Sequence, residues 1–227
     1  MGERENILGR IREALTIAAP VPGHHGESNH PKSDRPASSP RQWLPPVGAT
    51  VEQQFALFTK NAGVLKASFY LLNSREELKS KLRELSTTER WTKIATHTGD
   101  LTDLARETLK LPALSTDKAY DVNALEACDA GITGCDALIA QTGSVLVTSR
   151  SAGGRALSVL PPHHVVLARR EQLLPDMTAA FALLKKKYST GFPSFISFIT
   201  GPSRTGDIER ILVLGAHGPK KLTIFCV

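Results

Sequence analysis

The sequence predicts an α/β domain built around a largely parallel or mixed sheet. Short apolar runs that suit buried strands alternate along the chain with amphipathic segments that suit helices. Such alternation is typical of folds in which a helix carries the chain from one strand to the next. A chain of 227 residues, of which 41% are hydrophobic, is also long enough to bury the core of such a domain.

The first 46 residues are expected to lie outside this domain. Apolar residues at helical spacing, such as Ile7 and Ile11, predict an amphipathic helix over residues 1–19. Residues 20–46 are rich in Pro, His and Ser and hold too few apolar side chains to offset the entropy of ordering, which predicts a mobile linker. The α/β domain then spans residues 47–227.

In the first half of the domain, helices and strands are expected to alternate. Phe55 and Phe58 continue a helical stripe that ends at Gly63, a residue suited to a helix C-cap. Ser74 and Glu77 have the spacing of a capping box and predict the start of the next helix. After the first helix, the elements expected here are a buried strand over 67–72, a helix over 75–85, a strand over 91–96 and a helix over 101–109.

The second half is richer in strands and glycine. Two β-prone runs flank four turn-competent residues, Gln141 to Ser144, which predicts a hairpin. The remaining expected elements are a strand over 164–168, a helix over 176–188, and strands over 195–200 and 222–226.

Composition excludes several classes of protein. No window approaches the roughly 20 uninterrupted apolar residues of a membrane span, and the mixed charges of the first five residues do not suit an export signal, so we expect a cytoplasmic protein. Three cysteines without a C-x-x-C motif predict neither a disulfide framework nor a metal site. The net charge of +6 is spread over short runs without interleaved aromatics, so a nucleic-acid partner is not expected.

A run of polar residues follows the strand expected over 195–200. Ser203, Arg204, Thr205 and Asp207 come directly after a glycine and a proline, at the sheet edge where α/β folds place ligands. Arg204 suits a forked pair of hydrogen bonds with a carboxylate or phosphate. The alternative is that Arg204 and Asp207 pair with each other to brace the loop. We favour ligand binding, because a brace does not need the accompanying glycines and hydroxyls.

Three further places are candidates for the same site. Thr142, Gly143 and Ser144 could bring hydroxyl and backbone donors close to a ligand, although turns use the same residues for conformational reasons. His164 begins a strand and is either a proton donor or a satisfied core residue. His217 lies between glycines, where the alternative is a tight turn. We expect these turns to form one electropositive cleft with Arg204 facing inward.

The same segments resemble the lactate-utilisation protein C family, also called LutC/YkgG and defined by the LUD domain. The resemblance spans about residues 125 to 225 and lies in five short motifs: Gly131-Ile132-Thr133, Ala140 to Ser144, Leu160 to Val165, Gly201 to Glu209, and Gly215 to Pro219. Gln141 stands where the family usually has an acidic residue, which removes the charge that an acid or base role there would need. Ser144 stands where threonine is usual.

The resemblance implies a three-layer α/β/α fold similar to the NagB/RpiA/CoA-transferase-like group. It also implies an accessory role in oxidising L-lactate to pyruvate, together with two iron–sulfur partner proteins that hold the clusters. No cofactor is expected in this chain, since three cysteines cannot supply the four thiolates of a cluster. A free-standing enzyme acting on a sugar phosphate, a thioester or a folate-like substrate is the alternative, and nucleic-acid binding is a third hypothesis.

Overall fold

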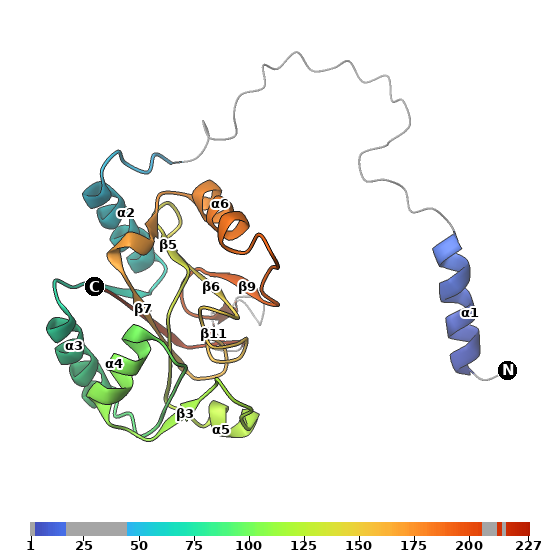
Figure 1. The fold of residues 1–227 in the computed structure, drawn as a ribbon, viewed down its shortest axis with the longest axis horizontal. Helices are drawn as coiled ribbons and strands as arrows, with labels where there is room; N and C mark the ends of the chain where they lie inside the picture. The colour runs from blue at the N-terminus through green and yellow to red at the C-terminus, as the bar shows by residue number, and fades with distance from the viewer. Residues whose placement is uncertain (1–2, 17–44, 206–212, 215–216) are drawn as a thin grey trace, which may run out of the picture. The chain divides into compact units, whose positions relative to one another are not determined.

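The structure is a computed structural model, drawn in Figure 1. It describes residues 3–16, 45–205, 213–214 and 217–227.

The chain divides into two units, Met1–Leu44 and Pro45–Val227. In the first unit, helix α1 spans Glu3–Thr16, within the segment where the sequence predicts an amphipathic helix. The predicted linker lies outside the described residues up to Leu44. In the second unit, the chain folds around a large parallel sheet.

Six strands form this sheet, and every neighbouring pair is parallel. In spatial order they are β1 (Ser68–Leu71), β12 (Lys221–Cys226), β7 (His163–Ala168), β4 (Ala130–Thr133), β2 (Ile94–Thr96) and β3 (Ala113–Ser115). The predicted α/β class with a largely parallel sheet is therefore confirmed. The expected strand over 67–72 exists as β1, but it lies at the sheet edge, where Tyr70 and Leu71 are exposed.

Helices cover both faces of the sheet (Figure 1). On one face, α3 (Arg75–Thr88) and α4 (Asp100–Leu109) pack against side chains such as Val165 and Phe225. On the other face, α2 (Val51–Val64) packs its buried Phe55 and Phe58 in a cluster with Val166 and Ile224. The short helix α5 (Val122–Glu126) buries Leu125 in a separate cluster with Ala95 of β2. Alternation along β7 and β12 thus supplies both core clusters.

A second sheet lies on the same face as α2. Its strands, in spatial order, are β8 (Leu173–Leu174), β5 (Ala137–Ile139), β6 (Ser144–Thr148) and β9 (Ile196–Ile199). β5 and β6 form the predicted antiparallel hairpin. Leu138 and Val145 face the main core, whereas Ile139 and Leu146 pack against α6 (Met177–Lys187). The sequence did not predict that these strands build a sheet of their own.

Local signals placed the helix starts well. The Ser74 hydroxyl accepts a hydrogen bond from Glu77 N at 3.2 Å, as a capping serine does. The return bond differs from the predicted capping box, because Glu77 Oε2 accepts from Asn73 N at 2.8 Å instead of from Ser74 N. Asp176 caps α6 in the same way, accepting from Ala179 N at 2.8 Å.

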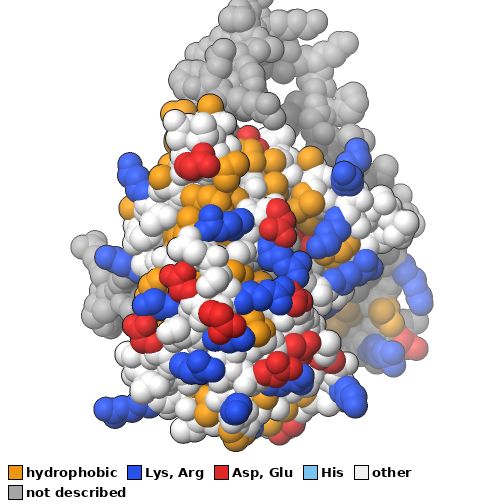
Figure 2. Space-filling view, turned by 60° about the vertical axis from the view of Figure 1, so that its left-hand side comes forward, with side chains coloured by type: hydrophobic (Ala, Val, Ile, Leu, Met, Phe, Trp, Pro, Cys, Tyr) orange, Lys and Arg blue, Asp and Glu red, His pale blue; other side chains and the backbone are white. Residues whose placement is uncertain are grey.

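The surface on the side of α2 and α3 has no dominant charge. Figure 2 shows Lys and Arg side chains interspersed with Asp and Glu on the face it presents, beside patches of hydrophobic side chains. Opposite charges also pair directly among the described residues, as Arg75 and Arg169 do with Asp100 at 2.6 Å each. The described side chains on this face therefore form no continuous cationic surface of the kind that binds a phosphate backbone.

A buried carboxylate joins α6 to the second sheet. Asp136 Oδ1 accepts hydrogen bonds from Lys187 Nζ at 2.6 Å and Tyr188 Oη at 2.7 Å, and the Asp136 side chain is fully buried. Thr148 Oγ1 lies 3.1 Å from the same Tyr188 hydroxyl. Burial acts to raise the pKa of Asp136, but hydrogen bonds from Lys187, Ser151 and Tyr188 outweigh it and lower the pKa.

We predict that Asp136→Asn destabilises the domain by about 1–3 kcal/mol at pH 7, because it removes a charged acceptor from this network. A carboxyl with a lowered folded pKa contributes stability above the unfolded pKa of about 3.9, and that contribution is lost as the pH falls through the folded pKa. The difference from the wild type should therefore shrink between pH 5 and pH 3 in urea unfolding. Glu76→Gln, at an exposed ion pair, serves as the control and should change stability by less than about 0.5 kcal/mol. An Asp136→Asn difference that stays constant with pH would contradict this account.

Candidate functional site

A pocket of about 310 Å³ opens between the second sheet and the turns that precede β10 (Arg204–Thr205) and β12. Five of the polar residues that line it are Ser158, His164, Ser203, Arg204 and His217. Its apolar wall includes Val159, Phe195, Ile199 and Leu222. Mostly apolar walls with a few converging polar groups are typical of small-molecule sites.

His164 is the most buried polar side chain of the pocket, at 1% exposed. It stands at the start of β7, and its Nε2 lies 2.8 Å from Thr133 Oγ1 of β4. Burial lowers the pKa of His164 to about 3, with a smaller contribution from neighbouring His163. The imidazole is therefore neutral at physiological pH. Its Nδ1 has no hydrogen-bond partner among the described residues.

Ser158 supplies a second buried polar atom without a partner. Its Oγ lies in the long connection between β6 and β7, and the residue is 2% exposed. A buried hydroxyl or imidazole nitrogen left without a hydrogen bond costs about 1–3 kcal/mol. Both residues line the pocket, and a polar ligand bound there is one way to supply the missing hydrogen bonds. The sequence offered no signal for Ser158, which lies in no recognisable motif.

Two of the predicted motifs meet at this pocket. Ser203 N donates to the Pro219 carbonyl at 2.8 Å, which joins the turn after β9 to the turn before β12. Gly201, with a φ of +87°, allows the first turn to approach α2, since a Cβ there would lie 2.7 Å from the Leu65 carbonyl oxygen. Arg204 lines the pocket, and its side chain is exposed to solvent and not packed in the hydrophobic core.

The structure places the remaining predicted site residues elsewhere. Thr142 and Gly143 do not line the pocket, and Gly143 instead packs against the backbone of α2. Ser144 takes part indirectly, because its Oγ lies 2.8 Å from Oγ1 of the pocket residue Thr200. Thr205 belongs to β10, paired with β11 (Val213–Leu214), and the predicted residue Asp207 lies outside the described residues. The expected cleft thus brings together His164, Ser203, Arg204 and His217 without the 142–143 turn.

Comparison with known proteins identifies the family. The family model named LUD domain matches residues 55–227. The chain belongs to the LUD domain family. The resemblance to lactate-utilisation protein C that the motifs predict is thereby confirmed, with the relatives below as further support.

Two relatives of the LUD domain protein carry a functional name. This chain is 38% identical over 109 residues to "Lactate utilization protein C" of Geobacillus kaustophilus, and the match covers 47% of this chain and 45% of that protein. It is 39% identical over 100 residues to the protein of the same name from Halalkalibacterium halodurans, covering 43% and 44%. The matched stretch therefore spans less than half of each relative.

One solved structure confirms the fold of this LUD domain. A DUF162 family protein from Deinococcus radiodurans superposes with a TM-score of 0.62 over 79% of this chain and 99% of the other, at 17% identity. The expected α/β layering is therefore shared with an experimentally determined structure.

His163 and His164 of the LUD domain lie on opposite faces of β7, as the strand alternation predicts, and both are buried. His163 packs edge-on against Trp91 on the α3 side, with ring centroids 5.4 Å apart. Its Nε2 lies 2.8 Å from Thr223 Oγ1 of β12. Burial lowers the pKa of His163 to about 4. Each histidine therefore pairs with a threonine of the neighbouring strand.

The described part of the LUD domain offers little for metal chemistry. No three of its described His, Cys, Asp or Glu side chains are grouped so as to hold a metal ion. Cys128, Cys135 and Cys226 are buried and free, and burial raises the pKa of each thiol. None of the described helices is long and apolar enough to cross a membrane.

We predict that Gly143 of the LUD domain is needed for folding and not for ligand contact. With a φ of +65°, an added Cβ would lie 2.7 Å from Ala62 N and 2.8 Å from the Asn61 carbonyl carbon. Gly143→Ala should therefore cost roughly 2–4 kcal/mol of unfolding free energy in urea. Gly63→Ala on the same helix α2 meets no atom within 4 Å and is the control; it should be neutral or stabilise by up to about 1 kcal/mol. Equal stability of the two variants would contradict this assignment.

Proposed function

We propose that this LUD domain protein acts in L-lactate utilisation, as an accessory subunit without a redox centre that supports the oxidation of L-lactate to pyruvate. The observation that carries the proposal is its membership of the LUD family together with relatives named lactate utilization protein C. Because those matches span less than half of each relative, the activity of the whole protein is part of the proposal.

The pocket around His164 is the proposed ligand site. Arg204 supplies a guanidinium suited to forked hydrogen bonds with a small carboxylate or phosphate. Ser203 adds a hydroxyl, while Ser158 Oγ and His164 Nδ1 each lack a partner among the described residues. If the Thr133 hydroxyl donates to His164 Nε2, Nδ1 holds the ring proton and can donate to an anionic ligand. The neutral imidazole then orients the ligand without adding a charge.

Electron transfer is assigned to partner proteins. Oxidation of lactate to pyruvate releases two electrons and two protons, and an acceptor must take them. The three cysteines of this chain are too few for a four-thiolate cluster, and their raised thiol pKa values disfavour the thiolate form that binds iron. We therefore propose two iron–sulfur partner proteins as the redox components.

The proposal predicts that Arg204→Ala abolishes growth on L-lactate in a strain that depends on this gene. The side chain is exposed, so the purified variant should keep a Tm within about 2 °C of the wild type. Arg106→Ala, which removes an exposed arginine paired with Asp103, is the control and should grow normally.

Normal growth of the Arg204→Ala strain would overturn the role of the pocket. Turnover of a sugar phosphate, thioester or folate-like compound by the purified protein alone would overturn the accessory role and favour a free-standing enzyme.

A further inference from the structure

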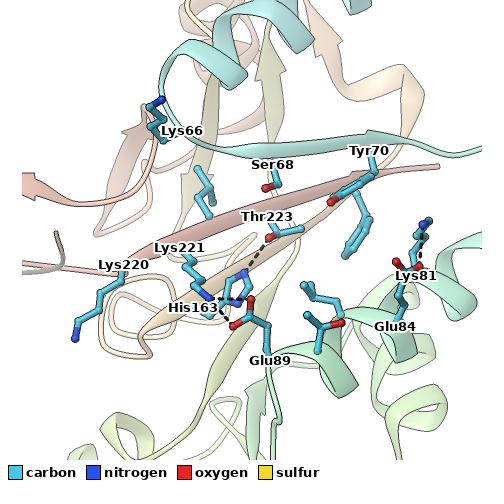
Figure 3. A pocket seen from close by; sticks show the side chains of 14 residues that line it. Lys66, Ser68, Tyr70, Lys81, Glu84, Glu89, His163, Lys220, Lys221 and Thr223 are labelled. Carbon is cyan, nitrogen blue, oxygen red and sulfur yellow. Dashed lines mark hydrogen bonds and ion pairs between the residues drawn. The ribbon is translucent and has the colours of Figure 1, made fainter.

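A second and larger pocket lies on the other face of β7 and β12, away from the candidate site. Its volume is about 430 Å³, within the range of roughly 300–1,000 Å³ typical of small-molecule sites. Its floor is the part of the sheet that α3 leaves uncovered, and α3 forms one wall (Figure 3). Nothing in the proposed role in lactate utilisation uses this pocket, which we call the β1 trough.

Three hydrogen-bonding side chains from three adjacent strands lie along the floor of the β1 trough. Ser68 of β1 stands in register with Thr223 of β12, and Thr223 Oγ1 lies 2.8 Å from His163 Nε2 of β7. Figure 3 shows these side chains following one another across the sheet. His163 is only 4% exposed, and its Nδ1 has no partner among the described residues. The floor therefore offers polar groups that the fold itself does not fully use.

Charge around the β1 trough favours an anion. Four lysines and two glutamates line it. Lys221 pairs with Glu89 at 2.6 Å and Lys81 with Glu84 at 2.8 Å, which neutralises these four charges. The two remaining lining lysines, Lys66 and Lys220, form no ion pair with a described residue and lie toward one end of the trough in Figure 3. Lysine is a common ligand for phosphate groups, which it binds as a mobile point charge.

The other end of the β1 trough presents an aromatic surface. The Tyr70 ring stacks on Phe225 with centroids 5.3 Å apart and an interplanar angle of 26°. Phe225 is buried, whereas Tyr70 is 40% exposed, so an accessible part of the Tyr70 ring faces outward. An exposed ring of this kind is a surface on which a planar group stacks.

The spacing of the two ends fits one ligand. Ser68 and Tyr70 are two residues apart on the same face of a strand, which places them about 6.6 Å apart along β1. That separation is comparable to the distance between the phosphate and the base of a 5′-mononucleotide. We propose that the β1 trough binds a 5′-mononucleotide, with its phosphate near Lys66, Lys220 and the Ser68 hydroxyl and its base on Tyr70.

Lys66 allows a variant that removes charge without damaging the fold. It follows the C-cap of α2 with a φ of +66°, a left-handed conformation that glycine adopts more easily than lysine. Lys66→Gly should therefore fold at least as well as the wild type. Lys110 ends α4 in the same conformation, with a φ of +53°, and does not line the β1 trough. Lys110→Gly is thus a control matched in residue type, charge and backbone conformation.

The test is isothermal titration calorimetry of the full chain with AMP as the probe at about 0.15 M salt, where long-range attraction is screened. We expect the wild type and Lys110→Gly to bind AMP with the same affinity, and Lys66→Gly to bind at least tenfold more weakly. Tyr70→Leu should lower the affinity for AMP to that of inorganic phosphate. Both Lys→Gly variants should keep their Tm within about 2 °C of the wild type.

Three results would overturn the proposal. The first is the absence of AMP binding to the wild type at millimolar concentration. The second is an equal loss of affinity in Lys66→Gly and Lys110→Gly, which would show only general attraction of anions. The third is equal affinity of the wild type for AMP and inorganic phosphate, which would remove the aromatic contact.

Discussion

The burial of β7 on both faces is the constraint on which the rest of the structure depends. All six residues of His163–Ala168 are buried, because parallel neighbours flank the strand and a core cluster packs against each of its faces. Two consecutive histidines at the start of such a strand must point to opposite faces. Each loses its hydration there, so both are held neutral. One strand thereby supplies a neutral imidazole to each of two separate pockets.

The candidate site also depends on contacts between distant segments. His164 is oriented by Thr133 of β4, and the turns around Ser203 and Pro219 are joined by a backbone hydrogen bond. Gly201 brings this assembly against the end of α2. The glycine-rich motifs that relate this chain to the LUD family therefore serve two purposes. Some bring turns together at the pocket, and others, like Gly143, allow close packing of backbone against helix.

Features governed by local chemistry could be predicted from the sequence. The cap at Ser74 and the hairpin turn from Gln141 to Ser144 follow from short-range hydrogen bonding and turn preferences, and both are present. His164 and Arg204, which line the candidate pocket, could be singled out because their motifs lie at strand ends.

Features set by long-range pairing could not be predicted in this way. β6 pairs with β9, matching Val145 with Ile199, although more than fifty residues separate them in the sequence. No local pattern indicates that these strands belong to a second sheet and not to the parallel one. Ser158 becomes a pocket residue only through the path of the chain between β6 and β7. Gly143 is a further example. A glycine permits a close approach of the backbone, and the sequence does not indicate whether the neighbour is a ligand or, as here, α2.

The central claim is that β7 buries two neutral histidines on opposite faces, each hydrogen-bonded to a threonine on a neighbouring strand. Titration of the imidazole nitrogens by NMR tests it most directly, with His163→Asn and His164→Asn used to assign the signals. The account predicts that both rings stay neutral down to about pH 5, with pKa values of about 4 for His163 and about 3 for His164. Protonation of either ring near the ordinary value of about 6.5 would contradict it.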